Sequence, residues 1–182
     1  MTILETERLL LVPYKASFIE ATLISDEALM EVSGYTVAKE WPGVEFFFYL
    51  PFVLEEVKKE PDMEKWTRLV VLKKENKIIG EVSAQGNPGK TGMTELGYGI
   101  VDSYAGQGYA TEAAAVFLNW LSASQHIQTI SAKTYLYHKK SQHVLNKLGF
   151  IKIGEGLIGG DEPVVNFEWR PENKVTDFLV ER

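Results

Sequence analysis

Residues 95–112 read Glu-Leu-Gly-Tyr-Gly-Ile-Val-Asp-Ser-Tyr-Ala-Gly-Gln-Gly-Tyr-Ala-Thr-Glu: a strand-like segment, a glycine turn and the start of a helix in immediate succession. Gly106 and Gly108 lack a Cβ atom, so the turn can bend sharply and expose its backbone N–H groups. A helix that begins near Tyr109 adds unpaired N–H groups and the positive end of its dipole at the same place. The stretch therefore predicts a site for an anionic diphosphate that needs no cationic side chain.

Two common nucleotide-binding loops do not fit this spacing. A Walker-type loop ends in Gly-Lys-Ser/Thr, and no such ending follows Gly108. A dinucleotide-binding loop has three glycines at its own spacing and an acidic residue about 20 positions later, inside a βαβ unit. A redox dehydrogenase is therefore a distant alternative, and the plainest alternative is a glycine turn before an ordinary helix.

The composition indicates one globular domain. The chain has 182 residues, 45% of them hydrophobic, which is enough for one well-buried core and too short for a second full domain. We expect this domain to span residues 1–170 and a charged tail to follow at 171–182. The absence of Cys excludes disulfides, a thiolate nucleophile and a thiolate metal site, and we expect no bound metal.

The charge and the hydropathy pattern limit the partners. A formal charge of −6 disfavours nucleic acid and mildly favours cationic partners such as amines or basic peptide ends. No stretch of about 18 uncharged apolar residues predicts a membrane span, and residues 1–8, with Glu5 and Glu7, are unlike a signal peptide. We therefore expect a cytoplasmic protein with no membrane contact, as a monomer or homodimer.

Hydrophobic spacing predicts alternating strands and helices. Helices are predicted over residues 17–33 (with a break near Ser25), 44–60, 109–122 and 140–148. Strands are predicted over residues 8–13, 66–72, 77–84, 93–101, 127–137, 150–155 and 163–169, with loops at 34–43, 86–92 and 156–161. This order indicates an α/β fold of the α+β type, with a mixed, largely antiparallel sheet flanked by helices.

The turn at residues 105–110 resembles the acyl-CoA-binding motif of the GNAT superfamily of N-acetyltransferases. In that motif a basic or Gln residue, two variable positions, Gly, one variable position and Gly or Ala form the pyrophosphate loop. Ala105 departs from the motif because it brings no side-chain donor, whereas the backbone cradle is kept. Residues 6–11, 95–98 and 141–150 are similar to the branch that contains the ribosomal-protein N-terminal (alanine/serine) acetyltransferases.

The resemblance implies a GNAT-like fold in which two central strands splay apart after a bulge. Here these strands are residues 93–101 and 127–137, and the pantetheine arm of acetyl-CoA inserts between them. The backbone groups of Ile100 and Val101 would pair with the pantetheine amides. The residues implied around the pyrophosphate are Ala105, Gly106, Gln107, Gly108, Tyr109, Ala110 and Thr111.

The implied activity is acetyl transfer from acetyl-CoA, as co-substrate, to a primary amine. A protein or peptide N-terminus is the first choice of acceptor, and a small amine, amino acid or polyamine is the second. The family often has Asn three residues before the Ser of the late motif, where its amide contacts the cofactor; His138 stands there and can make one such hydrogen bond. The departures at Ala105 and His138 leave a non-catalytic acyl-CoA-binding module as a rival.

Two catalytic residues follow from the resemblance. Ser141 corresponds to the Ser that is the partner of the leaving thiolate in the ribosomal-protein branch; as a plain alternative, Ser is also a common helix N-cap. Many relatives use a Tyr as this acid, but Leu145 occupies its position. Glu95, on the strand that would border the acetyl group, is the first candidate for the base, and Glu81 on the neighbouring strand is the second.

The acceptor pocket is predicted from aromatic and acidic residues in the loops and on the third β run. Tyr35, Trp41 and Tyr98 are candidate pocket walls, although aromatic residues in such places more often serve packing. Asp161, beside Glu162, could attract a cationic acceptor.

Overall fold

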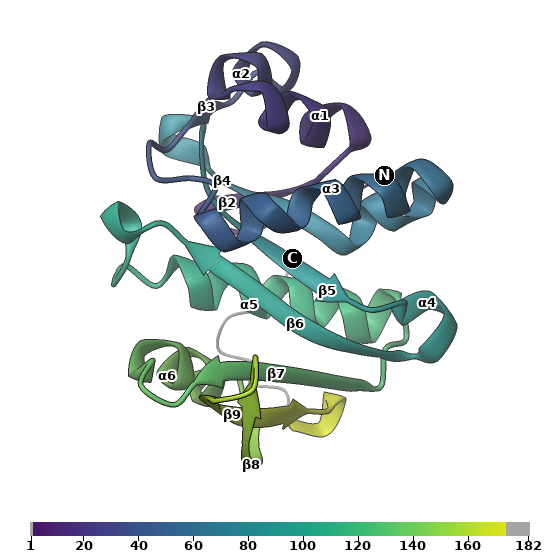
Figure 1. Cartoon of the computed structure of the whole chain (residues 1–182), viewed down its shortest axis with the longest axis vertical. Coiled ribbons are helices and arrows are strands. Elements are labelled where there is room, and N and C mark those ends of the chain that lie inside the picture. Colours follow the sequence, from purple (N-terminus) through teal and green to yellow (C-terminus); the bar gives the residue numbers. More distant parts are fainter. Residues whose placement is uncertain (1, 174–182) are drawn as a thin grey trace. The chain divides into compact units, whose positions relative to one another are not determined.

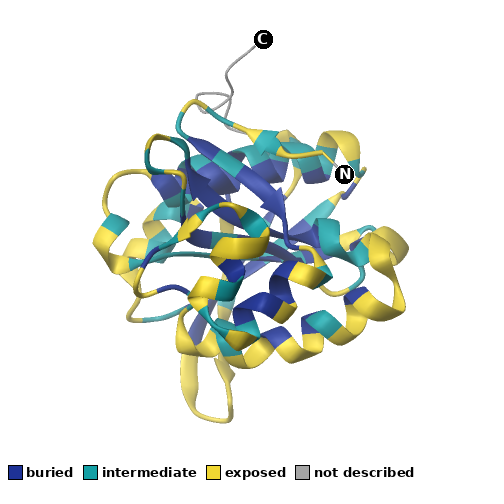
Figure 2. Cartoon of the chain, turned by 90° about the horizontal axis from the view of Figure 1, so that it is seen from above, coloured by how far each residue is buried: buried dark blue, intermediate teal, exposed yellow. Residues whose placement is uncertain are grey.

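The computed structural model describes residues 2–173, and these residues form two compact units. The first unit comprises the residues up to Ser83 together with Tyr98–Tyr109, and the second comprises Ala84–Gly97 together with the residues from Ala110 onward. Most strands are buried, whereas exposed residues gather on helices and turns (Figure 2). In the described part of the chain no helix is long and apolar enough to cross a membrane.

The first unit combines a sheet with three helices (Figure 1). Its helices are α1 (Ala16–Ile24), α2 (Asp26–Ser33) and α3 (Val44–Lys59). Its strands are β1 (Leu4–Glu5), β2 (Leu9–Pro13), β3 (Thr36–Val37), β4 (Thr67–Leu72) and most of β5 (Lys77–Gln85), in the order β1-β2-β4-β5 with β3 paired to β5. Short 3-10 turns are η1 (Pro61–Trp66), η2 (Lys73–Glu75) and η3 (Asp102–Tyr104).

The second unit has strands in the order β6-β7-β9-β8. They are β6 (Met93–Ile100, whose last residues belong to the first unit), β7 (Thr129–Tyr135), β8 (Ile151–Ile158) and β9 (Glu162–Trp169). The helices are α4 (Pro88–Thr91), α5 (Tyr109–Asn119), which continues as a π-helical turn at Trp120–Ser124, and α6 (Lys139–Lys147). A last 3-10 turn covers Pro171–Asn173.

The predicted mixed, largely antiparallel sheet with flanking helices is confirmed. Strand β3 pairs with β5, and β6 with β7, in parallel, whereas β1–β2, β2–β4, β4–β5, β7–β9 and β8–β9 are antiparallel. The parallel ladder of β6 and β7 joins Met93 to Thr129 and ends at the pair of Glu95 with Ser131. Strand β6 therefore leaves this ladder before Gly97, as a splayed strand does.

Buried aliphatic and aromatic side chains hold each unit together. In the first unit, Leu9, Leu69 and Ile78 are fully buried, and α1 packs against both α2 and α3. In the second unit, Phe117 and Ile130 are fully buried, and α6 packs against β7. Burial of such side chains stabilises a fold by roughly 1.5–3 kcal/mol each, so these clusters account for the formation of the sheets.

The predicted elements are present with shifted ends. The break in the first helix is confirmed, because Ser25 ends α1 and its Oγ accepts a hydrogen bond from the Ala28 backbone N–H at 3.1 Å, which caps α2. Strands β1 and β3 and helix α4 lie where no strand or helix was predicted. The predicted loop at 156–161 was too long, since β8 runs to Ile158 and the turn to β9 is short.

The domain boundaries remain predictions. The proposed single domain at residues 1–170 includes residues of both units, and most of the predicted tail at 171–182 lies outside the described residues.

Candidate functional site

The predicted phosphate loop is an exposed turn that runs directly into a helix. Gly106 and Gly108 have φ of 74° and 83°, the left-handed region that favours glycine. Residues 105–108 are exposed, and α5 begins at the buried Tyr109. No atom outside the turn would lie within 4 Å of a Cβ on Gly106. The turn thus offers open backbone N–H groups and a helix N-terminus, which fits a diphosphate.

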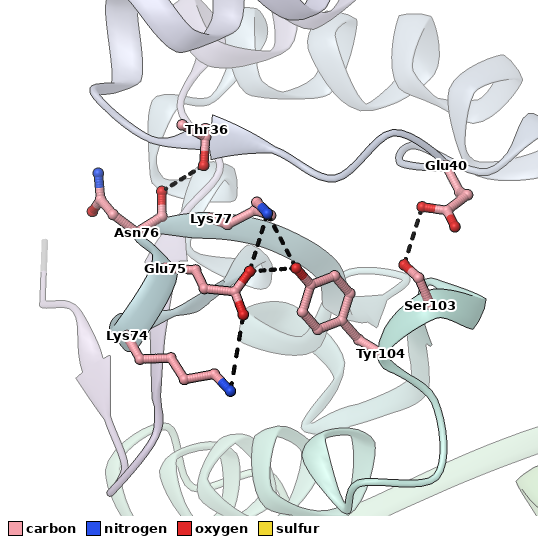
Figure 3. Close-up of polar contacts among 8 residues, drawn as sticks. All are labelled: Thr36, Glu40, Lys74, Glu75, Asn76, Lys77, Ser103 and Tyr104. Carbon is pink, nitrogen blue, oxygen red and sulfur yellow. Dashed lines mark hydrogen bonds and ion pairs between the residues drawn. The ribbon is translucent and has the colours of Figure 1, made fainter.

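The segment before this loop is anchored by polar side chains (Figure 3). The Tyr104 hydroxyl, in η3, donates to the Glu75 carboxylate, and Lys77 Nζ contacts both groups, at 3.0 Å from Glu75 and 3.2 Å from Tyr104. Ser103 Oγ donates to Glu40 Oε2 at 3.2 Å. These contacts tie η3 to the β5 start and to the segment before α3, so the loop begins from a fixed point.

Arg8 supports the loop itself, which the sequence analysis missed. Its Nη1 donates to the Gln107 carbonyl at 3.0 Å, and its guanidinium carbon lies 4.4 Å from the centre of the Tyr109 ring, in a cation–π contact. A Cβ on Gly108 would lie 3.4 Å from the second guanidinium nitrogen of Arg8. The Arg8 guanidinium thus lies at a loop whose first residue, Ala105, has no side-chain hydrogen-bond donor.

The two strand residues predicted to pair with pantetheine differ in what they can offer. The Val101 backbone N–H donates to the Ile79 carbonyl at 3.0 Å, and the Val101 carbonyl accepts from the Tyr104 N–H at 3.0 Å. Both backbone groups of Val101 therefore already have partners within the chain. Pairing of Ile100 with the pantetheine amides stays a prediction.

A half-buried carboxylate lies beside this strand. Glu81 Oε2 accepts a hydrogen bond of 2.6 Å from Trp41 Nε1, and Trp41 is only 2% exposed. A Cβ on Gly99 would lie 2.6 Å from Glu81 Oε1, so the carboxylate occupies the space that a side chain at residue 99 would fill. Burial raises the pKa of Glu81 from 4.5 to about 7, against the opposing effect of the Trp41 hydrogen bond.

Tyr14 completes the surroundings of this carboxylate. Its hydroxyl donates to Thr22 Oγ1 at 2.6 Å, and its ring centre lies 6.2 Å from those of Trp41 and Phe46. Burial raises the pKa of Tyr14 far above its ordinary value; the Thr22 hydrogen bond opposes this rise, and the charge of Glu81 adds to it. Tyr14 therefore stays neutral at physiological pH, and its ring lies beside Trp41, the hydrogen-bond donor to the carboxylate.

Glu95, the first predicted base, has a cationic partner. Its Oε2 lies 3.0 Å from Lys133 Nζ, and the exposed fractions of the two side chains are 32% for Glu95 and 42% for Lys133. The pair spans neighbouring strands, β6 and β7, next to the Glu95–Ser131 register. An acceptor ammonium at this point would compete with Lys133 for the carboxylate.

Ser141 and His138 lie at the start of α6. His138, not Ser141, is the N-cap residue, its side chain makes no capping hydrogen bond, and it is exposed. Ser141 is half-buried in the first turn. Gln142 Nε2 donates to the carbonyls of Tyr135 and Leu136 at 3.2 and 3.0 Å, which fixes the helix start to the end of β7. Leu145 is 1% exposed, a core residue where many relatives have the acid.

The predicted pocket residues differ in their exposure. Trp41 is a buried partner of Glu81, whereas Tyr35 and Tyr98 are half-buried. Asp161 is exposed in the turn between β8 and β9 of the second unit. Thr111 is buried in the first turn of α5, and Ala110 is half-buried. Trp41 is thus also a hydrogen-bond donor to Glu81, and the roles of these residues at the site stay predictions.

Comparison with known proteins identifies the family. Residues 8–151 match the model of the acetyltransferase (GNAT) domain. The chain belongs to the GNAT acetyltransferases. The uncharacterized N-acetyltransferase YjdG of Bacillus subtilis (strain 168) is 32% identical over 152 residues, which are 83% of this chain and 90% of that protein. The chain is accordingly an acetyl-CoA-dependent N-acetyltransferase.

Solved structures share the fold. A ribosomal-protein-S5-alanine acetyltransferase from Vibrio fischeri aligns over 99% of this chain and 100% of its own, with a TM-score of 0.67 and 23% identity. The microcin C7 self-immunity acetyltransferase MccE, in complex with acetyl-CoA and AMP, aligns over 91% of this chain and 93% of its own, with a TM-score of 0.63 and 15% identity. Acetyl-CoA is the co-substrate and amines are the acceptors in this family.

Proposed function

We propose that the acceptor is the N-terminal amine of a protein or peptide. The observation that carries this proposal is the set of motifs at residues 6–11, 95–98 and 141–150, which resemble those of the ribosomal-protein branch and lie in the same order. The formal charge of −6 agrees with it, because a chain of net negative charge attracts cationic amines and basic peptide ends. The enzyme is proposed to work in the cytoplasm as a monomer or homodimer.

The cofactor contacts are assigned to the loop and to β6. The N–H groups of residues 106–108 and the N-terminus of α5, with Ala110 and Thr111 in its first turn, would hold the pyrophosphate, whereas the Ala105 N–H already donates to the Asp102 carbonyl at 3.1 Å. Backbone groups near Ile100 would pair with the pantetheine amides. His138 is exposed at the N-cap of α6, and its imidazole would make one hydrogen bond to the cofactor arm.

Ser141 is proposed to donate a proton to the leaving thiolate. It is half-buried, and the Gln142 side chain fixes its helix turn against the end of β7. A fixed hydroxyl is a better donor than a mobile one, because its orientation is set before the reaction. Ser141→Ala should slow turnover while acetyl-CoA binding is kept, measured as kcat against KM for acetyl-CoA.

An acceptor screen tests the proposal directly. The enzyme is incubated with acetyl-CoA and either peptides that begin with Ala or Ser, or small amines, amino acids and polyamines, and products are read as an acetyl mass shift. We expect kcat/KM to be highest for the peptides, and acetylation to be lost when their N-terminus is blocked. Higher kcat/KM for a small amine would contradict the peptide assignment.

A further inference from the structure

Glu81 is a half-buried carboxylate that is paired with no cation among the described residues. It lies on β5 between the buried residues Gly80 and Val82, and its Cα partner on β4 is Leu69. The segment before α3 supplies Trp41, β6 supplies Gly99, and the residue after β2 is Tyr14. Among these neighbours Tyr14 is the titratable group, and it is neutral.

Burying a carboxylate without a cationic partner lowers the stability of the folded state. A buried carboxylate loses its hydration, and one hydrogen bond from an indole replaces only part of it. Structural carboxylates in proteins are usually paired with a cation, whereas no cation lowers the pKa of Glu81. A carboxylate whose pKa is raised by burial is typical of a group that exchanges protons near neutral pH.

The position of the carboxylate points to the reacting end of the substrates. Glu81 Oε1 faces Gly99, one residue before Ile100, where the pantetheine arm is proposed to pair. The backbone at residue 99 has no side chain to separate the carboxylate from a group lying along β6. The rings of Tyr14, Trp41 and Phe46 contact one another and form an apolar cluster. Within this cluster Trp41 donates the hydrogen bond to the carboxylate.

We propose that Glu81, rather than Glu95, is the base that takes the proton from the acceptor ammonium, with Trp41 as the positioning residue. This inference rests on the proposed acetyl transfer to an amine. Glu95 holds Lys133 at 3.0 Å, so its carboxylate already neutralises a cation of the protein. Glu81 accepts a hydrogen bond from Trp41, and among residues 2–173 it is paired with no cation.

The proton and electron balance of the step is simple. The Glu81 carboxylate accepts one proton from the ammonium, and the neutral nitrogen then attacks the thioester carbonyl carbon. A C–N bond forms, the C–S bond breaks, and the sulfur keeps the electron pair. The thiolate takes a proton from its proposed donor Ser141, the second proton of the nitrogen replaces the one that Ser141 loses, and Glu81 releases its proton to water. The products are the N-acetyl amine, free CoA thiol and one proton.

Glu81→Gln tests the inference, because the amide keeps the size and an acceptor for Trp41 but cannot take the proton. At pH 7 we expect kcat to fall by roughly 10²-fold, the low end for general base catalysis, with the KM for acetyl-CoA unchanged. The deficit should shrink towards pH 9, where more of the amine arrives neutral. Glu31→Gln, an exposed change on α2, is the matched control and should keep wild-type turnover.

The pH profile separates a base from a merely structural group. In wild type, kcat should rise with pH through a limb near neutral pH, since Glu81 must lose its proton before it can accept one. Glu81→Gln should lack this limb. Trp41→Phe keeps a ring but removes the N–H donor that favours the ionised form, so the limb should move to higher pH.

The outcomes distinguish this inference from the proposed function. If wild type acetylates no amine, the proposed function fails and the inference fails with it. If wild type is active and Glu81→Gln keeps its turnover from pH 6 to pH 9, the assignment of Glu81 alone is overturned. A larger loss in Glu95→Gln than in Glu81→Gln, with the neutral limb kept in Glu81→Gln, would likewise return the role to Glu95.

Discussion

At the scale of single residues, Gly80 and Gly99 in neighbouring strands have different structural roles. A Cβ on Gly80 would lie 2.0 Å from the Gly99 carbonyl oxygen, a backbone atom that cannot move without the strand. A Cβ on Gly99 would instead meet the end of the Glu81 side chain at 2.6 Å, and a side chain can rotate away. The first glycine therefore permits the strands to approach, and the second makes room for the carboxylate.

The two Ala substitutions should separate these roles. Gly80→Ala should destabilise the fold by about 1–3 kcal/mol or more, as overpacking does, measured by urea unfolding. Gly99→Ala should unfold at nearly the wild-type urea concentration, yet lose turnover because Glu81 is displaced. Equal losses of stability in both variants would contradict this division.

At the scale of elements, the phosphate loop depends on a residue far from it in the sequence. Arg8, just before β2, donates to the Gln107 carbonyl and lies over the Tyr109 ring. Both contacts fix the turn that exposes the loop N–H groups, so Arg8 organises the loop before the cofactor arrives. A preorganised loop binds more tightly because less conformational entropy is lost on binding.

Arg8→Ala should raise the KM for acetyl-CoA about 5- to 10-fold, the equivalent of one hydrogen bond and a weak cation–π contact. Turnover at saturating acetyl-CoA should change little. Arg8→Lys should resemble Arg8→Ala, because an ammonium lacks the planar fork that serves both contacts. Arg170→Ala, at an exposed ion pair on the other unit, is the control; an equal rise there would exclude a specific role for Arg8.

The sequence predicts local chemistry better than long-range placement. The glycine turn, the helix after it and the helix break at Ser25 each depend on residues a few positions apart, and each lies where it is predicted. The environment of Glu81 depends on Trp41, 40 positions before it, and on Gly99 in the next strand, so no local pattern marks it as the better base. Arg8 was within a recognised motif, at residues 6–11, but its contact with the loop joins residues 99 positions apart.

The surroundings of the candidate acceptor-pocket residues likewise could not be predicted from residue type. Trp41 and Asp161 were grouped because aromatic and acidic residues suit a cationic acceptor. In the structure Trp41 is buried against Glu81, and Asp161 lies in an exposed hairpin turn. Residue type alone cannot tell a binding residue from a packing residue when the two differ only in what surrounds them.

At the scale of the whole molecule, the enclosed carboxylate links stability to pH. The folded pKa of Glu81, about 7, lies above the ordinary value of 4.5, so between these values the folded state binds more protons than the unfolded state. The contribution of Glu81 to stability is therefore fully present below about pH 4.5 and is lost as the pH rises through 7. The loss is on the order of 3 kcal/mol for a shift of this size.

Glu81→Gln should remove this dependence, because its side chain never ionises. We expect the variant to be more stable than wild type at pH 8, by up to about 3 kcal/mol, and close to wild type at pH 5, measured by urea unfolding at both values. Glu31→Gln should shift neither value. A stability difference that is the same at pH 5 and pH 8 would show that burial does not penalise the charge of Glu81. A wild-type protein that is active but less stable than Glu81→Gln at pH 8 would follow the general pattern in which active-site residues lower stability.

Strand β8 has a further consequence for the protein in concentrated solution. It ends the strand order of its unit and exposes four large aliphatic side chains: Ile151, Ile153, Leu157 and Ile158. Its register against β9 shifts between Lys152 and Gly154, and Lys152 forms an ion pair of 2.6 Å with Glu155. An irregular, charged edge is a poor template for pairing with another chain. The register shift and the ion pair should therefore disfavour edge-to-edge aggregation through β8, where aliphatic side chains are exposed.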